Sequence, residues 1–130
     1  MTRFEKIILS ITGGSHLSVH ALMLALPSLI PVIRNEFDVG LSTLGFVVSI
    51  SGFMFGLGAI PAGWAEKRFG GRQLLLIYQA GSSISALLVA LSGSFAMMVV
   101  GLSMMGFFCS IYHPAGLTLI SHRVKSLTRG

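Results

Sequence analysis

The amino-acid sequence predicts an all-α polytopic membrane protein with four transmembrane helices. Hydrophobic residues make up 53% of the 130 residues and charged residues only 10%, whereas about 25% of the residues in an average soluble domain are charged. The charges also leave three long gaps, in which no Asp, Glu, Lys or Arg occurs: 7–33, 39–65 and 73–122. Since about 20 apolar residues cross a bilayer, each gap is long enough for at least one membrane span.

The first two gaps each predict one span. We expect the first span over residues 7–33, bent or ended by Pro27 and Pro31, because proline removes a backbone hydrogen bond from a helix. The polar stretch 34–40 then forms a loop, and the second span covers residues 41–65. The apolar run near the start is too long for a signal peptide, so we interpret it as a retained first helix.

The third gap predicts two spans. Its 50 residues would form a helix about 75 Å long, more than twice the thickness of the hydrocarbon core. The small polar residues 92–94 lie near its middle and indicate a turn. The third span is therefore expected over residues 73–91 and the fourth over residues 95–121.

The distribution of basic residues predicts the orientation of the chain. Eight of the nine Lys and Arg residues lie before the first span, between the second and third spans, or after the fourth. Only Arg34 lies in a connector on the opposite side. Cytoplasmic loops are enriched in Lys and Arg, so both termini are expected in the cytoplasm, with the chain in the plasma (cytoplasmic) membrane.

The second span carries a strip of small residues. The spacing of 7, 4, 3 and 4 places five of them on one helical face: Gly45, Gly52, Gly56, Ala59 and Gly63. Small side chains allow two membrane helices to approach closely. The strip is therefore a candidate helix-packing surface. Its partner is either another of the four helices, or a helix that moves or lies outside this chain.

The connector after the second span carries the most specific motif, formed by Gly63, Glu66, Arg68, Gly70 and Arg72. It resembles the cytoplasmic loop between helices two and three of major facilitator superfamily transporters. That loop reads Gly, three residues, Asp, a basic residue, any residue, Gly and a basic pair. Lys67 stands where the family has its acid, and Gly71 replaces the first residue of the basic pair. The family's acid contacts the other half of the transporter, so the resemblance implies a conformational role for this loop.

The fourth span ends in Tyr112-His113-Pro114. This stretch is similar to the aromatic-His-Pro stretch of a family subgroup that includes fosmidomycin-resistance-type exporters. The resemblance implies that residues 1–130 are part of the N-terminal six-helix half of the fold, with the remaining helices of the transporter and membrane lipid as partners. The chain is then a fragment or a truncated product, and Arg129-Gly130 leads into a fifth helix.

Three histidines lie at predicted membrane depth, where an ionisable side chain is a functional candidate. His16 and His20 are four residues apart and share one face of the first span. In the fourth span the spacing of 3, 4 and 3 places four residues on one face: Ser103, Gly106, Ser110 and His113. In the resembled family the first and fourth helices line the central cavity, which implies that these histidines and serines line the substrate path. The alternative is that each histidine only hydrogen-bonds to a neighbouring helix.

These features predict a secondary active transporter that moves a small solute by alternating access, with the proton as a candidate coupling ion. Nucleic acid is not an expected partner, because the basic residues lie in connectors and not on one face of a soluble domain. No enzyme activity, cofactor or metal is expected, since we find no phosphate-binding loop, metal-ligand spacing or nucleophile–base pair. Two alternatives remain open, a small-multidrug-type exporter and a non-transporting four-helix scaffold. The former requires a carboxylate in its first helix, and residues 7–33 contain none.

The resemblance also ranks two glycines by their tolerance to substitution. The third helix is peripheral in the resembled family, whereas the small-residue strip lies on the second. We therefore expect transport to tolerate Gly81→Leu better than Gly56→Leu.

Overall fold

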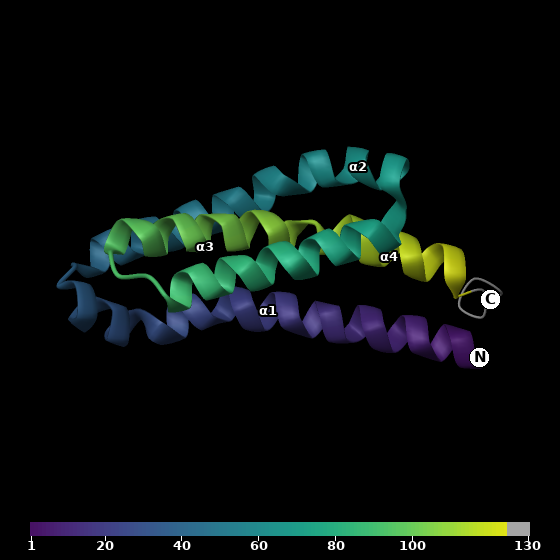
Figure 1. The fold of residues 1–130 in the computed structure, drawn as a ribbon, viewed down its shortest axis with the longest axis horizontal. Helices are drawn as coiled ribbons and strands as arrows, with labels where there is room; N and C mark the ends of the chain where they lie inside the picture. Colours follow the sequence, from purple (N-terminus) through teal and green to yellow (C-terminus); the bar gives the residue numbers. More distant parts are fainter. Residues whose placement is uncertain (125–130) are drawn as a thin grey trace.

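The computed structural model describes residues 1–124 of the chain. In order, the helices are α1 (Arg3–Phe37), α2 (Leu41–Ala90), α3 (Phe95–Ser110) and α4 (Tyr112–Arg123). Figure 1 shows an elongated bundle in which the beginning of α1 and the end of α4 lie at the same end. The all-α fold class is confirmed. The predicted lead-in to a fifth helix lies outside the described residues.

Three helices in the described part of the chain are long and apolar enough to cross a membrane. They are Arg3–Phe37, Leu41–Ala90 and Phe95–Arg123, the last comprising α3 and α4. The second of these is two helices joined by a kink at Gly70, where the backbone has φ 77° and ψ 158°. Only glycine adopts this conformation readily. We call the part of α2 before Gly70 the first arm and the part after it the second arm.

The two arms run in opposite directions, as Figure 1 shows. Along the first arm, the Ser51 hydroxyl donates to the Leu102 carbonyl at 3.1 Å, and Gly58 lies beside Phe107 further along both helices. The first arm is therefore parallel to α3. The first arm and α3 pack so closely at Gly58 that there is no room for a side chain between the two helices.

The second arm is antiparallel to α3. Gly81 lies against the Phe108 ring, whereas Ser85, further along the arm, lies beside Gly101, which comes earlier in α3. The reversal at Gly70 therefore places one arm on each side of α3. The predicted spans 41–65 and 73–91 fall on the two arms.

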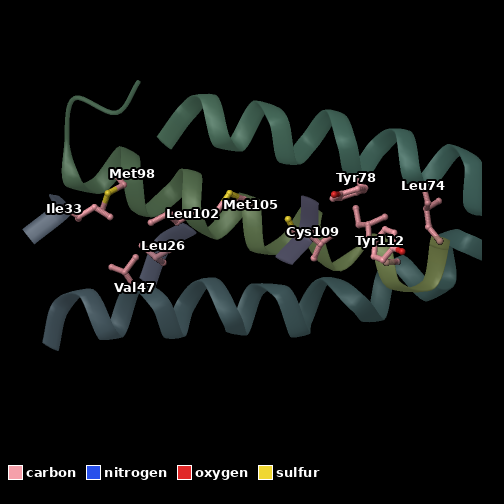
Figure 2. Close-up of a cluster of buried hydrophobic side chains, with 14 of the residues drawn as sticks. Leu26, Ile33, Val47, Leu74, Tyr78, Met98, Leu102, Met105, Cys109 and Tyr112 are labelled. Atoms are coloured by element: carbon pink, nitrogen blue, oxygen red, sulfur yellow. The ribbon is translucent and has the colours of Figure 1, made fainter. Parts of the chain in front are cut away.

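The core follows α3 between the arms (Figure 2). Met98, Leu102, Met105 and Cys109 are all buried along α3. Near α4, Figure 2 shows Leu74 and Tyr78 of the second arm close to Tyr112. Most other large apolar side chains point outward, as expected of helices whose outer faces contact lipid.

The sequence predicted that Pro27 and Pro31 bend or end the first span, and the structure excludes an end of α1 at either proline. The helix continues through Pro27 and Pro31 to Phe37. Proline is tolerated inside membrane helices, where Ser side chains can bond to backbone groups of the same helix. The Ser28 hydroxyl does so here, donating to the Leu24 carbonyl at 2.9 Å.

The expected loop over residues 34–40 is correspondingly shorter. Arg34 to Phe37 belong to the helix, which ends where Asp38 adopts a left-handed conformation with φ 49° and ψ 49°. The Asp38 N–H donates to the Arg34 carbonyl and caps the last turn. The polar composition of this stretch therefore marks the end of the helix and not a loop along its whole length.

Helix α1 packs through a narrow seam. Its buried residues recur at every seventh position, namely Glu5, Thr12, Val19, Leu26 and Ile33. A repeat of seven residues is two helical turns, so these side chains form one line along the helix. His16 and His20 lie beside this line and remain exposed. The seam therefore positions both imidazoles at the edge of the contact between α1 and the rest of the bundle.

Candidate functional site

An open groove of about 420 Å³ runs along α1 beside α4. Its lining is mainly apolar and includes two imidazoles: Leu9, Thr12, Gly13, His16, Leu17, His20, Tyr112 and Ile120. Gly13 leaves space in the wall, because a Cβ atom added there would meet no atom within 4 Å. An apolar groove with a few convergent polar groups is the usual form of a small-molecule site.

The two imidazoles of α1 are in direct contact. The Nε2 atoms of His16 and His20 lie 2.9 Å apart, and the ring centroids are separated by 4.7 Å. A spacing of four residues places the two rings one above the other on successive helical turns. One nitrogen of this contact must donate a hydrogen and the other must accept it.

Helix α4 contributes two aromatic rings to the same place. The ring of His16 lies edge-on to Tyr112, with the centroids 5.4 Å apart, and to His113, with the centroids 5.9 Å apart. His113 also contacts Phe55 of the first arm, at 5.7 Å between centroids. The structure therefore brings together all three histidines that the sequence singled out.

Two tyrosines connect α1 to the rest of the bundle at this level. The Tyr112 hydroxyl donates to the Thr12 carbonyl at 2.8 Å, and the Tyr78 hydroxyl donates to the Ser15 carbonyl at 3.0 Å. Both phenol rings are buried, and their centroids lie 5.8 Å apart. The two bonds hold the turn of α1 that precedes His16 against α4 and the second arm.

Neither tyrosine is predicted from the sequence to be a positioning residue. They are the only two tyrosines of the chain, and a buried Tyr normally finds a partner for its hydroxyl. The need of a buried tyrosine hydroxyl for a hydrogen-bond partner is the signal in the sequence that could have identified them. The sequence does not show which carbonyls, 63 and 100 residues away along the chain, would be the acceptors.

The serines of the predicted stripe lie elsewhere. Ser110 is buried beside Gly58, and its hydroxyl donates to the Phe107 carbonyl at 2.6 Å. Ser103 donates to the Val99 carbonyl at 2.8 Å and lines a separate apolar groove that includes Met54. The α3 part of the stripe therefore faces the first arm, and His113 is the member of the stripe near the α1 imidazoles.

The loop motif forms the turn between the arms. A third groove, of about 300 Å³, lies between this turn and α4, and its charged lining residues are Glu66, Arg72 and Arg123. The Arg68 guanidinium carbon lies 5.6 Å from the ring centroid of Phe69. The motif thus contributes the acid Glu66 and the base Arg72 to one groove.

The structure explains why glycine replaces a basic residue at position 71. Gly71 is buried, and a Cβ atom there would lie 2.6 Å from the Ala115 carbonyl oxygen and 2.9 Å from Leu119 Cγ. Close approach of α4 therefore leaves no room for a side chain at this position.

The small-residue strip on the first arm faces away from the described helices. A Cβ atom added at Gly45, Gly52, Gly56 or Gly63 would meet nothing within 4 Å, and Ala59 is exposed. The first arm packs against α3 through Gly58 instead. The strip therefore makes no close contact with another helix of the described chain.

Within residues 1–124, no group of three or more His, Cys, Asp or Glu side chains is arranged to hold a metal ion. The groove between α1 and α4 is lined by imidazole nitrogens, by the backbone of Gly13 and by apolar side chains. These groups can bind and orient an amphipathic molecule and exchange protons with it.

Comparison with known proteins gives one family match. The model of the Major Facilitator Superfamily matches residues 11–130. The chain is 31% identical over 110 residues to the Tetracenomycin C resistance and export protein of Streptomyces glaucescens, covering 79% of this chain and 20% of that protein. It is 29% identical over 106 residues to the MFS-type transporter ppzB of Metarhizium majus (strain ARSEF 297), covering 78% of this chain and 23% of that protein. No solved structure matches the chain at comparable significance. The chain thus spans about a fifth of the length of these relatives.

Proposed function

The chain belongs to the major facilitator superfamily, and from this premise we propose that it is part of the N-terminal half of a secondary active transporter that moves a small solute by alternating access. The observation that carries the proposal is the groove between α1 and α4, in which the imidazoles of His16 and His20 meet otherwise apolar walls. Membership of this family removes the small-multidrug-type exporter as an alternative. A non-transporting scaffold is the remaining rival.

The lining of the groove suits an amphipathic solute. Apolar side chains would contact its body, while the imidazoles would hydrogen-bond to a polar group, as in other small-molecule sites. One relative is named for resistance and export, which supports export as the direction of transport. The Tyr112-His113-Pro114 stretch supports placing the chain in a subgroup similar to the fosmidomycin-resistance-type exporters.

Two further surfaces fit a role in a larger transporter. The outward-facing strip from Gly45 to Gly63 has room for close approach of another helix, and we propose that this helix lies outside the described chain. The turn that carries Glu66 and Arg72 would then contact the opposite half of the transporter. Rocking of one half against the other would change both contacts during the transport cycle.

The proposed orientation can be measured with reporter fusions. Fusions after Arg72 and after Arg129 should report a cytoplasmic position, and fusions after Asp38 and Gly93 an external one. The reason is the excess of Lys and Arg in the segments that are expected to be cytoplasmic. A cytoplasmic signal at Gly93 would show that the second arm and α3 do not form a transmembrane hairpin.

The proposed solute path can be tested by filling the groove. We expect Gly13→Leu to lower solute efflux at least about tenfold, because the new side chain would occupy the groove beside His16, and a barrier rise of about 1.4 kcal/mol is enough for this effect. The groove is open at this position, so the substitution should leave the fold intact. The measurement is efflux of a panel of amphipathic solutes from cells that produce the chain together with any reading frame that follows it.

Gly14→Leu is the matched control. Gly14 is exposed, has the same free space around its Cβ position and does not line the groove. Its variant should export at the level of the unmodified protein, with equal amounts of both variants in the membrane fraction. If no solute is exported even by the unmodified protein, the scaffold alternative is favoured. If both variants are equally active, the groove is not the solute path.

A further inference from the structure

The contact between His16 and His20 restricts their protonation. Their Nε2 atoms lie 2.9 Å apart, which is a normal hydrogen-bond distance for two nitrogens. An imidazolium ring carries hydrogens on both nitrogens and cannot accept. At least one of the two rings must therefore be neutral, with an unprotonated Nε2, whenever this contact exists.

The titratable groups around the pair are few. Helix α1 has no Asp, Glu, Lys or Arg between Ile7 and Ile33. Helix α4 contributes His113 and the Tyr112 phenol, and the second arm contributes the Tyr78 phenol, whose hydroxyl is bonded to the Ser15 carbonyl. The first arm presents Phe55, which packs on His113. No carboxylate lines the groove, so the imidazoles are the side chains of its lining whose nitrogens can bind a proton.

We propose that His16 and His20 together form a binding site for one proton. In the neutral pair, one ring donates its Nε2 hydrogen, and the other accepts at Nε2 and carries its own hydrogen on Nδ1. A first proton binds to the free Nδ1 lone pair of the donor ring, and the Nε2 contact remains. A second proton would need the Nε2 lone pair that accepts the hydrogen bond, so its binding breaks the contact and separates the rings.

Two observations give this site a function, namely the exposure of the pair and the position of His113 on α4. Both imidazoles are exposed in the groove, so a proton can reach them, and a solute can bind beside them. The ring centroid of His113 lies only 5.9 Å from that of His16, so a positive charge on the pair disfavours a second charge across the groove. This inference rests on the proposed function, and it names the pair as the carrier of one coupling proton per transport cycle.

Nitrogen NMR of the chain in lipid nanodiscs tests the site without any solute. With histidine labelled in the ring, ¹⁵N shifts distinguish Nε2–H, Nδ1–H and doubly protonated rings. At alkaline pH we expect opposite tautomers for His16 and His20. As the pH falls from about 8 to about 5, the range in which histidine titrates, one ring should become doubly protonated while the other keeps an unprotonated Nε2. The same tautomer in both rings, or protonation of both rings together, would overturn the proposal.

Proton uptake over the same pH interval gives an independent count. In a His113→Gln background, which removes the coupled imidazole on α4, the chain with both His16 and His20 should take up one proton more than the double variant H16Q/H20Q, and each single variant, H16Q or H20Q, should take up as many protons as the chain with both histidines. Independent histidines would instead give a difference of two protons for the double variant and one for each single variant. His122→Gln is the control for a single independent histidine, because His122 is exposed at the end of α4 and lies outside the groove, and it should lower the count by its own proton. A correct count without solute efflux would contradict the proposed function but not the one-proton site.

Discussion

We expect Gly81→Leu to lower the free energy of unfolding by about 3 kcal/mol, the upper part of the range for an overpacked core. Gly81 of the second arm is buried against α3, and a Cβ atom there would lie 2.6 Å from Cε1 of the Phe108 ring. A leucine side chain would therefore push the second arm away from α3. The measurement is unfolding of the purified chain in mixed detergent micelles, followed by circular dichroism.

Gly56→Leu is the matched control on the first arm. Gly56 is helical and exposed and has no neighbour within 4 Å of its Cβ position, so leucine should not destabilise the chain and should raise the free energy of unfolding by up to about 1 kcal/mol, the difference in helix propensity. From the sequence, we ranked the same two substitutions the other way for transport, because the second helix carries the small-residue strip. Both rankings can hold, since one concerns packing within this chain and the other concerns a helix outside it. Equal loss of stability in both variants would contradict the described packing of α2.

Gly70→Ala is expected to cost about 2 kcal/mol, because φ 77° with ψ 158° is a backbone region that is essentially restricted to glycine. The strain would fall on the reversal between the two arms, so the hairpin of α2 should open before the rest of the bundle. Hydrogen exchange of the amides next to position 70, together with the unfolding midpoint in detergent, measures this effect.

Gly63→Ala is the control for this prediction and should act in the opposite direction. Gly63 belongs to the same motif, but it is helical and has nothing near its Cβ position. Alanine there should stabilise the first arm by up to about 1 kcal/mol, the difference in helix propensity between the two residues. If both alanine variants behave alike, the special backbone conformation at Gly70 is not needed for the turn.

Several features of the molecule follow from the sequence alone because they depend on local composition. The gaps between charges predict helices and their approximate lengths, since a bilayer requires long apolar segments with satisfied backbone groups. The Gly-rich, basic connector indicates the reversal that the structure places at Gly70. The spacing of four residues puts His16 and His20 on one face, and their contact follows directly from helical geometry.

The tertiary structure decided which faces meet, and this cannot be read from helical periodicity. Gly45, Gly52 and Gly56 share a face, yet the first arm packs against α3 through Gly58, which lies beside Phe107 on another side of the arm. Ser110 was expected at the substrate path and is buried against that arm instead. In a membrane, small and apolar residues are equally compatible with lipid and with a neighbouring helix, so their pattern alone does not identify the contact face.

For the same reason, the sequence predicts the histidines as site residues but not the tyrosines that position them. The sequence places His16 and His113 on helices predicted to face a cavity, but not the bonds from Tyr112 and Tyr78 to backbone carbonyls of α1. Every backbone carbonyl of a helix is chemically the same acceptor, so the sequence carries no mark of which one a distant hydroxyl will reach. Nor does the sequence show that α1 continues through Pro27 and Pro31 to Phe37, because tolerance of a proline depends on the bonds and packing around it. The sequence by itself thus determined the helices and the chemistry they carry, whereas the relative placement of the helices decided which of these groups form a site.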